Sequence, residues 1–174
     1  MLRFTATVLT SAVLAACAPM LQRGPDNSLE HPEILLALND SMDLISFQAT
    51  KPDRILSSVA VKGLRSGDSI IGIDYRVNKK MLYAVSRAGQ VYTLDSASGN
   101  LTPVGSIPHI KLLGSKFGVN HNPAADKIRV VSDKGQNLRF HPDTGVLAGT
   151  DNTLRYAEND VQEADVSTVG ATAY

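Results

Sequence analysis

Two stretches of this chain repeat each other at a constant offset of 46 residues. Residues 86–99 read SRAGQVYTLDSASG, and residues 132–145 read SDKGQNLRFHPDTG. A fainter copy, residues 37–47, precedes residues 84–94 by 47 residues. A period of this length predicts one structural unit that recurs along the chain. The alignment of the two clear copies needs no gap and keeps three glycine pairs in register, namely Gly72 with Gly118, Gly89 with Gly135, and Gly99 with Gly145.

The units have the pattern of strands and turns rather than of helices. Apolar side chains alternate with others over residues 71–77 (IGIDYRV), which predicts a strand with one apolar face. Residues 88–89 and 134–135 each end in glycine and stand between apolar runs, as two-residue hairpin turns do when glycine supplies the positive φ. Such turns predict four cross-strand pairs: Val131 with Leu138, Arg129 with Phe140, Val85 with Tyr92, and Tyr83 with Leu94.

A sheet of about four strands that recurs every 40 to 50 residues is typical of a β-propeller blade. We therefore predict an all-β fold of roughly three four-stranded, propeller-like units. They fall at about residues 33–62, 69–107 and 116–157, with the start of another at 167–174. A β-sandwich of two similar halves is the alternative. Because closed propellers carry about four to eight blades, we expect incomplete closure, through C-terminal truncation or with self-association through open blade edges.

The first residues have the features of an export signal: a basic residue, a short apolar run and then small residues. The tetrapeptide LAAC at residues 14–17 resembles the lipobox of bacterial lipoproteins, whose cysteine is acylated. We expect a signal peptide at residues 1–16, a lipid on Cys17, and a flexible tether that ends at residue 32. Ala18 is not the aspartate that retains lipoproteins in the inner membrane, which predicts the outer membrane. An ordinary secretory signal with an incidental cysteine is the alternative.

Two long segments resemble a known family of bacterial exported domains. LSSVAVKGLRSGDSIIGIDYRVNKKMLYAVSRAGQVYTLD and FGVNHNPAADKIRVVSDKGQNLRFHPDTG are similar to DUF4394, a propeller-like family of unknown function. The resemblance spans about residues 34–174, and its most specific part is residues 122–145. It implies a propeller-like fold and supplies no activity. Because domains of this family usually run on well past the point where this chain stops, the resemblance also predicts a truncated domain.

Polar residues in one predicted hairpin form the candidate binding or structural cluster. Arg129 stands where the preceding unit has a tyrosine, on an otherwise apolar face, and Asn137 and Arg139 follow in the next strand. Polar groups inside a blade must be paired or must line a channel. We predict that Arg129 is structural and bonds to Asp126, to Asp133 or to backbone carbonyls. Ligand binding by Arg129, Asn137, Arg139 and Asp126 is the alternative.

Spacing identifies no catalytic or metal site. The four histidines, His31, His109, His121 and His141, are not at metal-ligand spacing, so we expect structural or surface roles for them. The acidic stretch 158–165 (ENDVQEAD) lacks the spacing and central glycine of a calcium loop. We expect a solvated loop and no cofactor there, with calcium as the alternative. No serine, cysteine or lysine has an acid-base partner at a recognisable spacing.

Charge and architecture narrow the function classes. Lys and Arg together number 17, as do Asp and Glu, so no net charge draws the chain to nucleic acid. We expect a lipid-anchored envelope protein, facing the periplasm or the cell surface, that is a binding or scaffold module for a protein or polymer. The alternative is a propeller-type hydrolase or lyase that acts on a glycan through converging acids. Binding is favoured because Asp74 and Asp95 become Asn120 and His141 in the next unit.

Overall fold

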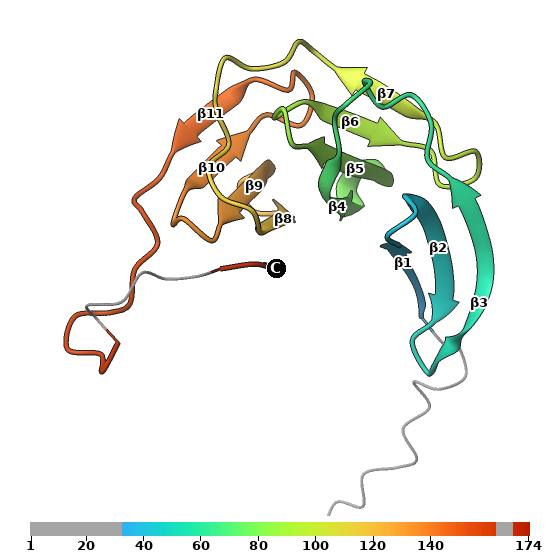
Figure 1. The fold of residues 1–174 in the computed structure, drawn as a ribbon, viewed down its shortest axis with the longest axis horizontal. Coiled ribbons are helices and arrows are strands. Elements are labelled where there is room, and N and C mark those ends of the chain that lie inside the picture. The colour runs from blue at the N-terminus through green and yellow to red at the C-terminus, as the bar shows by residue number, and fades with distance from the viewer. Residues whose placement is uncertain (1–32, 163–168) are drawn as a thin grey trace, which may run out of the picture. The chain divides into compact units, whose positions relative to one another are not determined.

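A computed structural model of the chain describes residues 33–162 and 169–174, all of which fall in one compact unit, Glu33–Tyr174. The predicted signal peptide, Cys17 and the tether lie outside the described residues. Within the unit, eleven strands form three antiparallel sheets (Figure 1). No helix of the described residues is long and apolar enough to cross a membrane. The prediction of an all-β fold with propeller-like units is confirmed.

Each sheet is a meander in which strands pair in chain order. The first sheet contains β1 (Ile34–Leu38), β2 (Asp43–Gln48) and β3 (Lys51–Ala60). The second contains β4 (Ile70–Arg76), β5 (Met81–Ser86), β6 (Val91–Leu94) and β7 (Leu101–Val104), with a short 3-10 helix, Val77–Lys79, between β4 and β5. The third contains β8 (Phe117–Asn122), β9 (Lys127–Ser132), β10 (Asn137–Phe140) and β11 (Leu147–Thr150).

The repeat in the sequence is a repeat of the fold. Strands β9, β10 and β11 begin 46 residues after β5, β6 and β7. In the first sheet, Leu38 pairs with Leu44, and in the second sheet Val85 pairs with Val91. Each residue of the second pair lies 47 residues after its equivalent in the first pair. Strands β1, β2 and β3 are therefore equivalent to β5, β6 and β7. Four strands were expected in every unit, but the first sheet has three among the described residues.

The hairpin turns contain three residues rather than the predicted two. Ser132 donates its N–H to the carbonyl of Gln136, and Gly135 donates to the carbonyl of Ser132, which leaves residues 133–135 in the loop. Gly135 has a φ of +71°, the left-handed conformation that ends a three-residue hairpin loop. The same turn recurs at the equivalent positions Gly89, with a φ of +83°, and Met42, with a φ of +63°.

This longer turn shifts the strand register by one residue. Val131 pairs with Asn137, and Arg129 pairs with Arg139. The predicted partners Leu138 and Phe140 are therefore wrong, and so are the equivalent pairs in the second sheet, where Val85 pairs with Val91 and Tyr83 with Thr93. Since side chains alternate between faces, the shift places the two arginines opposite each other on one face of the third sheet.

Two hydrophobic clusters cover both faces of the second sheet. On one face, Tyr83, Val85 and Val91 pack with third-sheet residues that include Val130 and Phe140. On the other face, Leu82, Ala84, Tyr92 and Leu94 pack with Leu44 of the first sheet. Each fully buried side chain of this size contributes roughly 1.5–3 kcal/mol. Three sheets packed in succession match a propeller-like arrangement rather than the two layers of the alternative sandwich.

Two equivalent glycines lie where a strand packs closely against the next segment of the chain. A Cβ on Gly72 of β4 would lie 2.6 Å from the Cβ of Val119 in β8, so only glycine fits unless the two strands separate. The equivalent Gly118 lies against residues 171–172 in the same way. The described residues 169–174 thus run beside β8 as β8 runs beside β4, although they contain no assigned strand.

Candidate functional site

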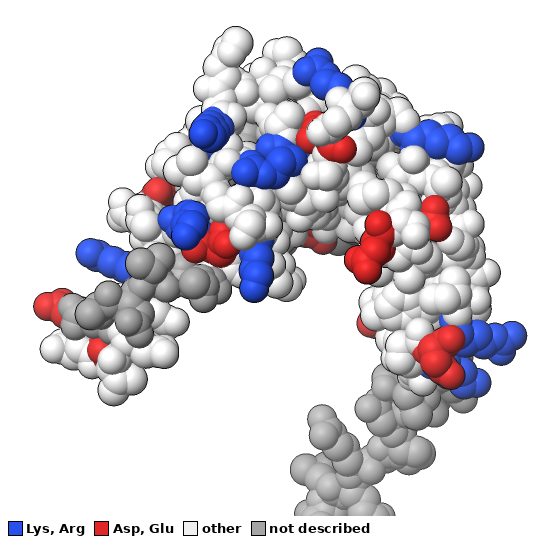
Figure 2. Space-filling model, viewed as in Figure 1, with Lys and Arg blue, Asp and Glu red and all other residues white. Residues whose placement is uncertain are grey.

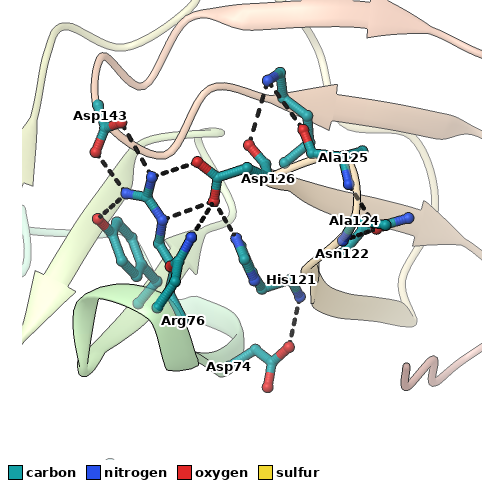
Figure 3. Close-up of polar contacts among 11 residues, drawn as sticks. Asp74, Arg76, His121, Asn122, Ala124, Ala125, Asp126 and Asp143 are labelled. Atoms are coloured by element: carbon teal, nitrogen blue, oxygen red, sulfur yellow. Dashed lines mark hydrogen bonds and ion pairs between the residues drawn. The ribbon is translucent and has the colours of Figure 1, made fainter.

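A buried arginine at the end of β4 joins the second sheet to the third (Figure 3). The Arg76 side chain is 2% exposed, and it binds two carboxylates of the third sheet. Its Nε donates to Asp126 Oδ1 at 2.8 Å, and its Nη2 donates to Asp126 Oδ2 at 2.5 Å. Its Nη1 donates to Asp143 Oδ1 at 2.5 Å and to the Tyr83 hydroxyl at 3.2 Å. We call Arg76, Asp126, Asp143 and His121 the Arg76 clamp.

Chain topology brings the clamp residues to one end of the sheets. Asp126 ends the turn between β8 and β9, and Asp143 lies in the loop between β10 and β11. In an antiparallel meander these two loops fall at the same end of the sheet. Asp126 has a φ of +50°, a conformation that aspartate tolerates better than most residues. Asn122 orders the same turn, because its Oδ1 accepts the N–H groups of Ala124 and Ala125.

His121 adds a second connection between β4 and β8. Its Nε2 lies 2.9 Å from Asp126 Oδ1, and its backbone N–H donates to Asp74 Oδ2 of β4. His121 is only 5% exposed, so its ring is enclosed between the two sheets. Asn78 also donates to Asp126 Oδ1, at 3.4 Å. Residues from both sheets therefore fix the orientation of the Asp126 carboxylate.

The clamp holds both of its carboxyl groups in the ionised form. The hydrogen bond from Arg76 is the main cause that lowers the pKa of Asp126 well below its usual range, against the opposing effect of burial. The hydrogen bond from Arg76 likewise lowers the pKa of Asp143. The carboxylates are 40% and 66% exposed, so water reaches their outer sides. A general acid must carry a proton that it can donate, and neither of these carboxyl groups carries one at neutral pH.

A second polar cluster lies on the outer face of the third sheet. The Arg129 Nη2 lies 3.2 Å from Asp151 Oδ2, and Arg139 donates to Asp151 Oδ1 at 2.7 Å from Nη2 and at 3.0 Å from Nε. Arg129 Nη1 donates to Asn137 Oδ1 at 2.6 Å. We call Arg129, Asn137, Arg139 and Asp151 the Arg129 cluster. It exists because the register shift places both arginines on one face, beside the residue that follows β11.

The Arg129 cluster has one more positive charge than negative charge. Two guanidinium groups share the Asp151 carboxylate, and the Arg129 Nε is buried without a partner among the described residues. A cavity of about 560 Å³ adjoins the cluster and is lined by Asn137, by Asp151 and by residues 152–155. The cluster can therefore hold the edge of the sheet together and present a partly exposed arginine, Arg139, to solvent.

Comparison with known proteins places the domain in a family. A family model described as "Domain of unknown function (DUF4394)" matches residues 43–174. The chain belongs to this family. No curated protein matches the sequence. Among solved structures, BamB from Moraxella catarrhalis aligns with a TM-score of 0.38 and 15% sequence identity, over 70% of this chain and 35% of that chain.

The DUF4394 domain brings three of the four sequence-predicted cluster residues together. Arg129, Asn137 and Arg139 are in contact, whereas Asp126 lies in the Arg76 clamp. The predicted carboxylate partners of Arg129 are wrong, since its ion pair is with Asp151. The other predicted partner, Asp133, instead accepts hydrogen bonds from the backbone and hydroxyl of Ser115. Because Asp151 follows the last strand of the unit, only the folded sheet shows that it is near.

Sequence reasoning missed the Arg76 clamp in this DUF4394 domain. Arg76 lies 50 residues from Asp126 and 67 from Asp143, so no local spacing connects them. The one available signal was a departure from the repeat, since the next unit has Asn122 in place of Arg76.

The remaining candidate ligands are separate from one another. His109 and His141 are exposed, His121 is buried in the clamp, and His31 lies outside the described residues. Residues 163–165 of the predicted acidic loop also lie outside them. In the part of the chain that is described, no three His, Cys, Asp or Glu residues gather as metal ligands do.

Proposed function

We propose that the protein is a lipid-anchored envelope protein that acts as a binding or scaffold module for a protein or polymer partner. A lipid on Cys17 would hold it in the bacterial outer membrane, facing the periplasm or the cell surface. The observation that carries the proposal is the Arg76 clamp. Its charged groups are used to fix one sheet against the next, which suits a rigid platform whose loops and clefts contact a partner.

The electrostatics of the clamp favour this proposal over a glycan hydrolase or lyase. Glycoside hydrolysis needs one carboxyl group that stays protonated near neutral pH beside a second that is ionised. Asp126 and Asp143 converge on one guanidinium, but Arg76 lowers the pKa of both. A pair of this kind supports structure rather than proton donation.

The distribution of surface charge supports a partner that is neither strongly acidic nor strongly basic. Figure 2 shows acidic and basic side chains interspersed over the viewed face. This pattern agrees with the absence of net charge in the sequence. The outermost strand of the first sheet, β3, is exposed along nearly all of its ten residues, and we propose that such edges support self-association.

The first experiment tests binding against turnover. The purified chain would be incubated with soluble envelope glycans, and both bound ligand and newly formed reducing ends would be measured. We expect saturable binding without new reducing ends. Release of reducing ends that disappears in both Asp126→Asn and Asp143→Asn would overturn the proposal in favour of a hydrolase.

A second experiment tests the anchor. Cells that express the chain would be labelled with a radioactive fatty acid and then fractionated into inner and outer membranes. We expect label on the wild-type chain in the outer-membrane fraction and none on Cys17→Ser, produced at a similar level. An unlabelled wild-type chain would contradict lipidation, and label confined to the inner membrane would contradict the proposed location.

A further inference from the structure

A cleft of about 550 Å³ lies where the first sheet meets the second. Leu36 of β1 and Leu94 of β6 contribute apolar walls, and Tyr75 stands at the end of β4. Lys80 follows the 3-10 helix, and Asp95 and Asn100 come from the loop between β6 and β7. Except for Leu36, these residues belong to the end of the second sheet that also carries the Arg76 clamp. The cleft lies on the face of that sheet opposite to the clamp.

This cleft is the repeat equivalent of the space that Arg76 fills between the second and third sheets. Leu36 corresponds to Tyr83 at the offset of 47 residues, and Tyr75 corresponds to His121 at the offset of 46. Lys80 corresponds to Asp126, and both residues have a positive φ, +53° and +50°.

The equivalent residues have the wrong chemistry to bind an arginine. Where the clamp offers Arg76 a hydroxyl and a carboxylate, the cleft has the leucine side chain of Leu36 and the ammonium group of Lys80. An ammonium group repels a guanidinium instead of pairing with it. The described residues of this junction therefore lack the partners that hold Arg76 in the other junction.

The lining combines an apolar wall with hydrogen-bonding groups of both kinds. Leu94 is 4% exposed and Tyr75 is 45% exposed, so a ring face is accessible beside a buried apolar floor. Lys80 forms no ion pair with any described residue and has N–H groups available to donate. The Asp95 Oδ1 accepts hydrogen bonds from Ser98 and Ala97, which lower the pKa of Asp95 and keep it an ionised acceptor.

We propose that this cleft binds a short neutral oligosaccharide, an inference that rests on the proposed binding function and names its ligand class. A sugar hydroxyl both donates and accepts, so it can satisfy Lys80 and Asp95 together, while the C–H face of a pyranose ring packs on Tyr75 and Leu36. One cation and one anion in the lining give a charged ligand no net advantage. A wholly apolar ligand would bury both charges without partners.

The test is a titration of the purified chain with cellotriose, N,N′,N″-triacetylchitotriose and maltotriose, followed by calorimetry and by saturation-transfer NMR. We expect at least one trisaccharide to bind at millimolar concentration or below. Tyr75→Ala should weaken that binding about tenfold or more, because the aromatic ring of the lining is removed. The matched control is Tyr174→Ala, which removes a tyrosine that is 68% exposed and outside the cleft lining, and it should leave the affinity unchanged.

Two further measurements address the folding of the variants and the role of charge. Thermal unfolding should show that Tyr75→Ala stays folded, and Asn100→Ala provides a milder variant that should weaken binding several-fold. Binding should change little between low and high salt, because the ligand is neutral.

Four results would overturn the inference. They are no detectable binding of any of the three sugars, equal affinities for wild type and Tyr75→Ala, a strongly salt-dependent preference for an acidic sugar, and displacement of the sugar by extended peptides that bind more tightly. New reducing ends during the titration would contradict the proposed binding function instead, and they would leave the cleft as a sugar site. The two failures are therefore distinguishable.

Discussion

Replacement of Arg76 by methionine is the most direct test of how the sheets are held together. Arg76→Met keeps an unbranched apolar stem in the buried space and removes the guanidinium. The variant loses five hydrogen bonds, four of which join the guanidinium to carboxylates of the third sheet. The second and third sheets would then be held by their hydrophobic cluster and by the contacts of His121.

The size of the expected loss in unfolding free energy follows from the burial of each charged group in the clamp. Breaking a fully buried ion pair typically costs about 3–5 kcal/mol, because a charge remains buried without compensation. Here the guanidinium is 2% exposed, but Asp126 and Asp143 are 40% and 66% exposed and regain water when Arg76 is lost. We therefore expect the free energy of unfolding to fall by about 2–4 kcal/mol. For a domain of this size that corresponds to roughly 5–15 °C in melting temperature.

Guanidinium chloride unfolding, followed by circular dichroism, measures this loss. Arg54→Met is the matched control, since Arg54 is an exposed arginine of β3, and it should change the free energy of unfolding by less than about 0.5 kcal/mol. A double-mutant cycle with Asp143→Asn should give a coupling energy of about 1–2 kcal/mol. An Arg76→Met variant as stable as the Arg54 control, or a coupling energy near zero, would refute this account of the clamp.

Three further predictions concern pH, packing and the Arg129 cluster. The folded-state pKa values of Asp126 and Asp143 are lowered, so the stabilising contribution of these carboxylates is fully present above about pH 4 and is lost as pH falls through the folded-state pKa values. Urea unfolding at acid pH should therefore show that the difference in unfolding free energy between wild type and Arg76→Met shrinks. A constant difference down to about pH 2 would contradict this prediction. Gly72→Ala should cost about 1–3 kcal/mol in the same unfolding assay, because its Cβ would collide with Val119, and an unchanged midpoint would mean that the sheets separate easily. Arg129→Leu should lower the melting temperature measured by calorimetry, since it removes one of the two arginines on Asp151, and an unchanged value would argue against a paired structural role.

The architecture could be predicted from the sequence because the same local pattern of strands and turns occurs twice along the chain. The glycine pairs and the alternation of β4 predicted strands, turns and a unit of about 46 residues. Strands β5, β6 and β7 recur as β9, β10 and β11 at that period to the residue. The register was not accessible, because glycine in a turn fits both two-residue and three-residue loops. The choice depends on hydrogen bonds across the hairpin, such as that from Ser132 to Gln136.

For the candidate sites, the sequence could single out some residues but not their partners. Arg129 could be singled out because a charge replaces an apolar residue in the repeat, but its partner Asp151 could not. Arg76 and the cleft beside Tyr75 depend on which residues of one sheet face those of the next.

By itself the sequence determined that the chain forms repeated, strand-rich units, because apolar alternation and glycine turns are local properties with their own free-energy preferences. Only the tertiary structure decided that one junction closes around Arg76 while the equivalent junction opens into a cleft. The physical reason is that ion pairs and clefts arise between side chains far apart in sequence. Their strength depends on burial and on distances of a few ångströms that only the packed sheets impose.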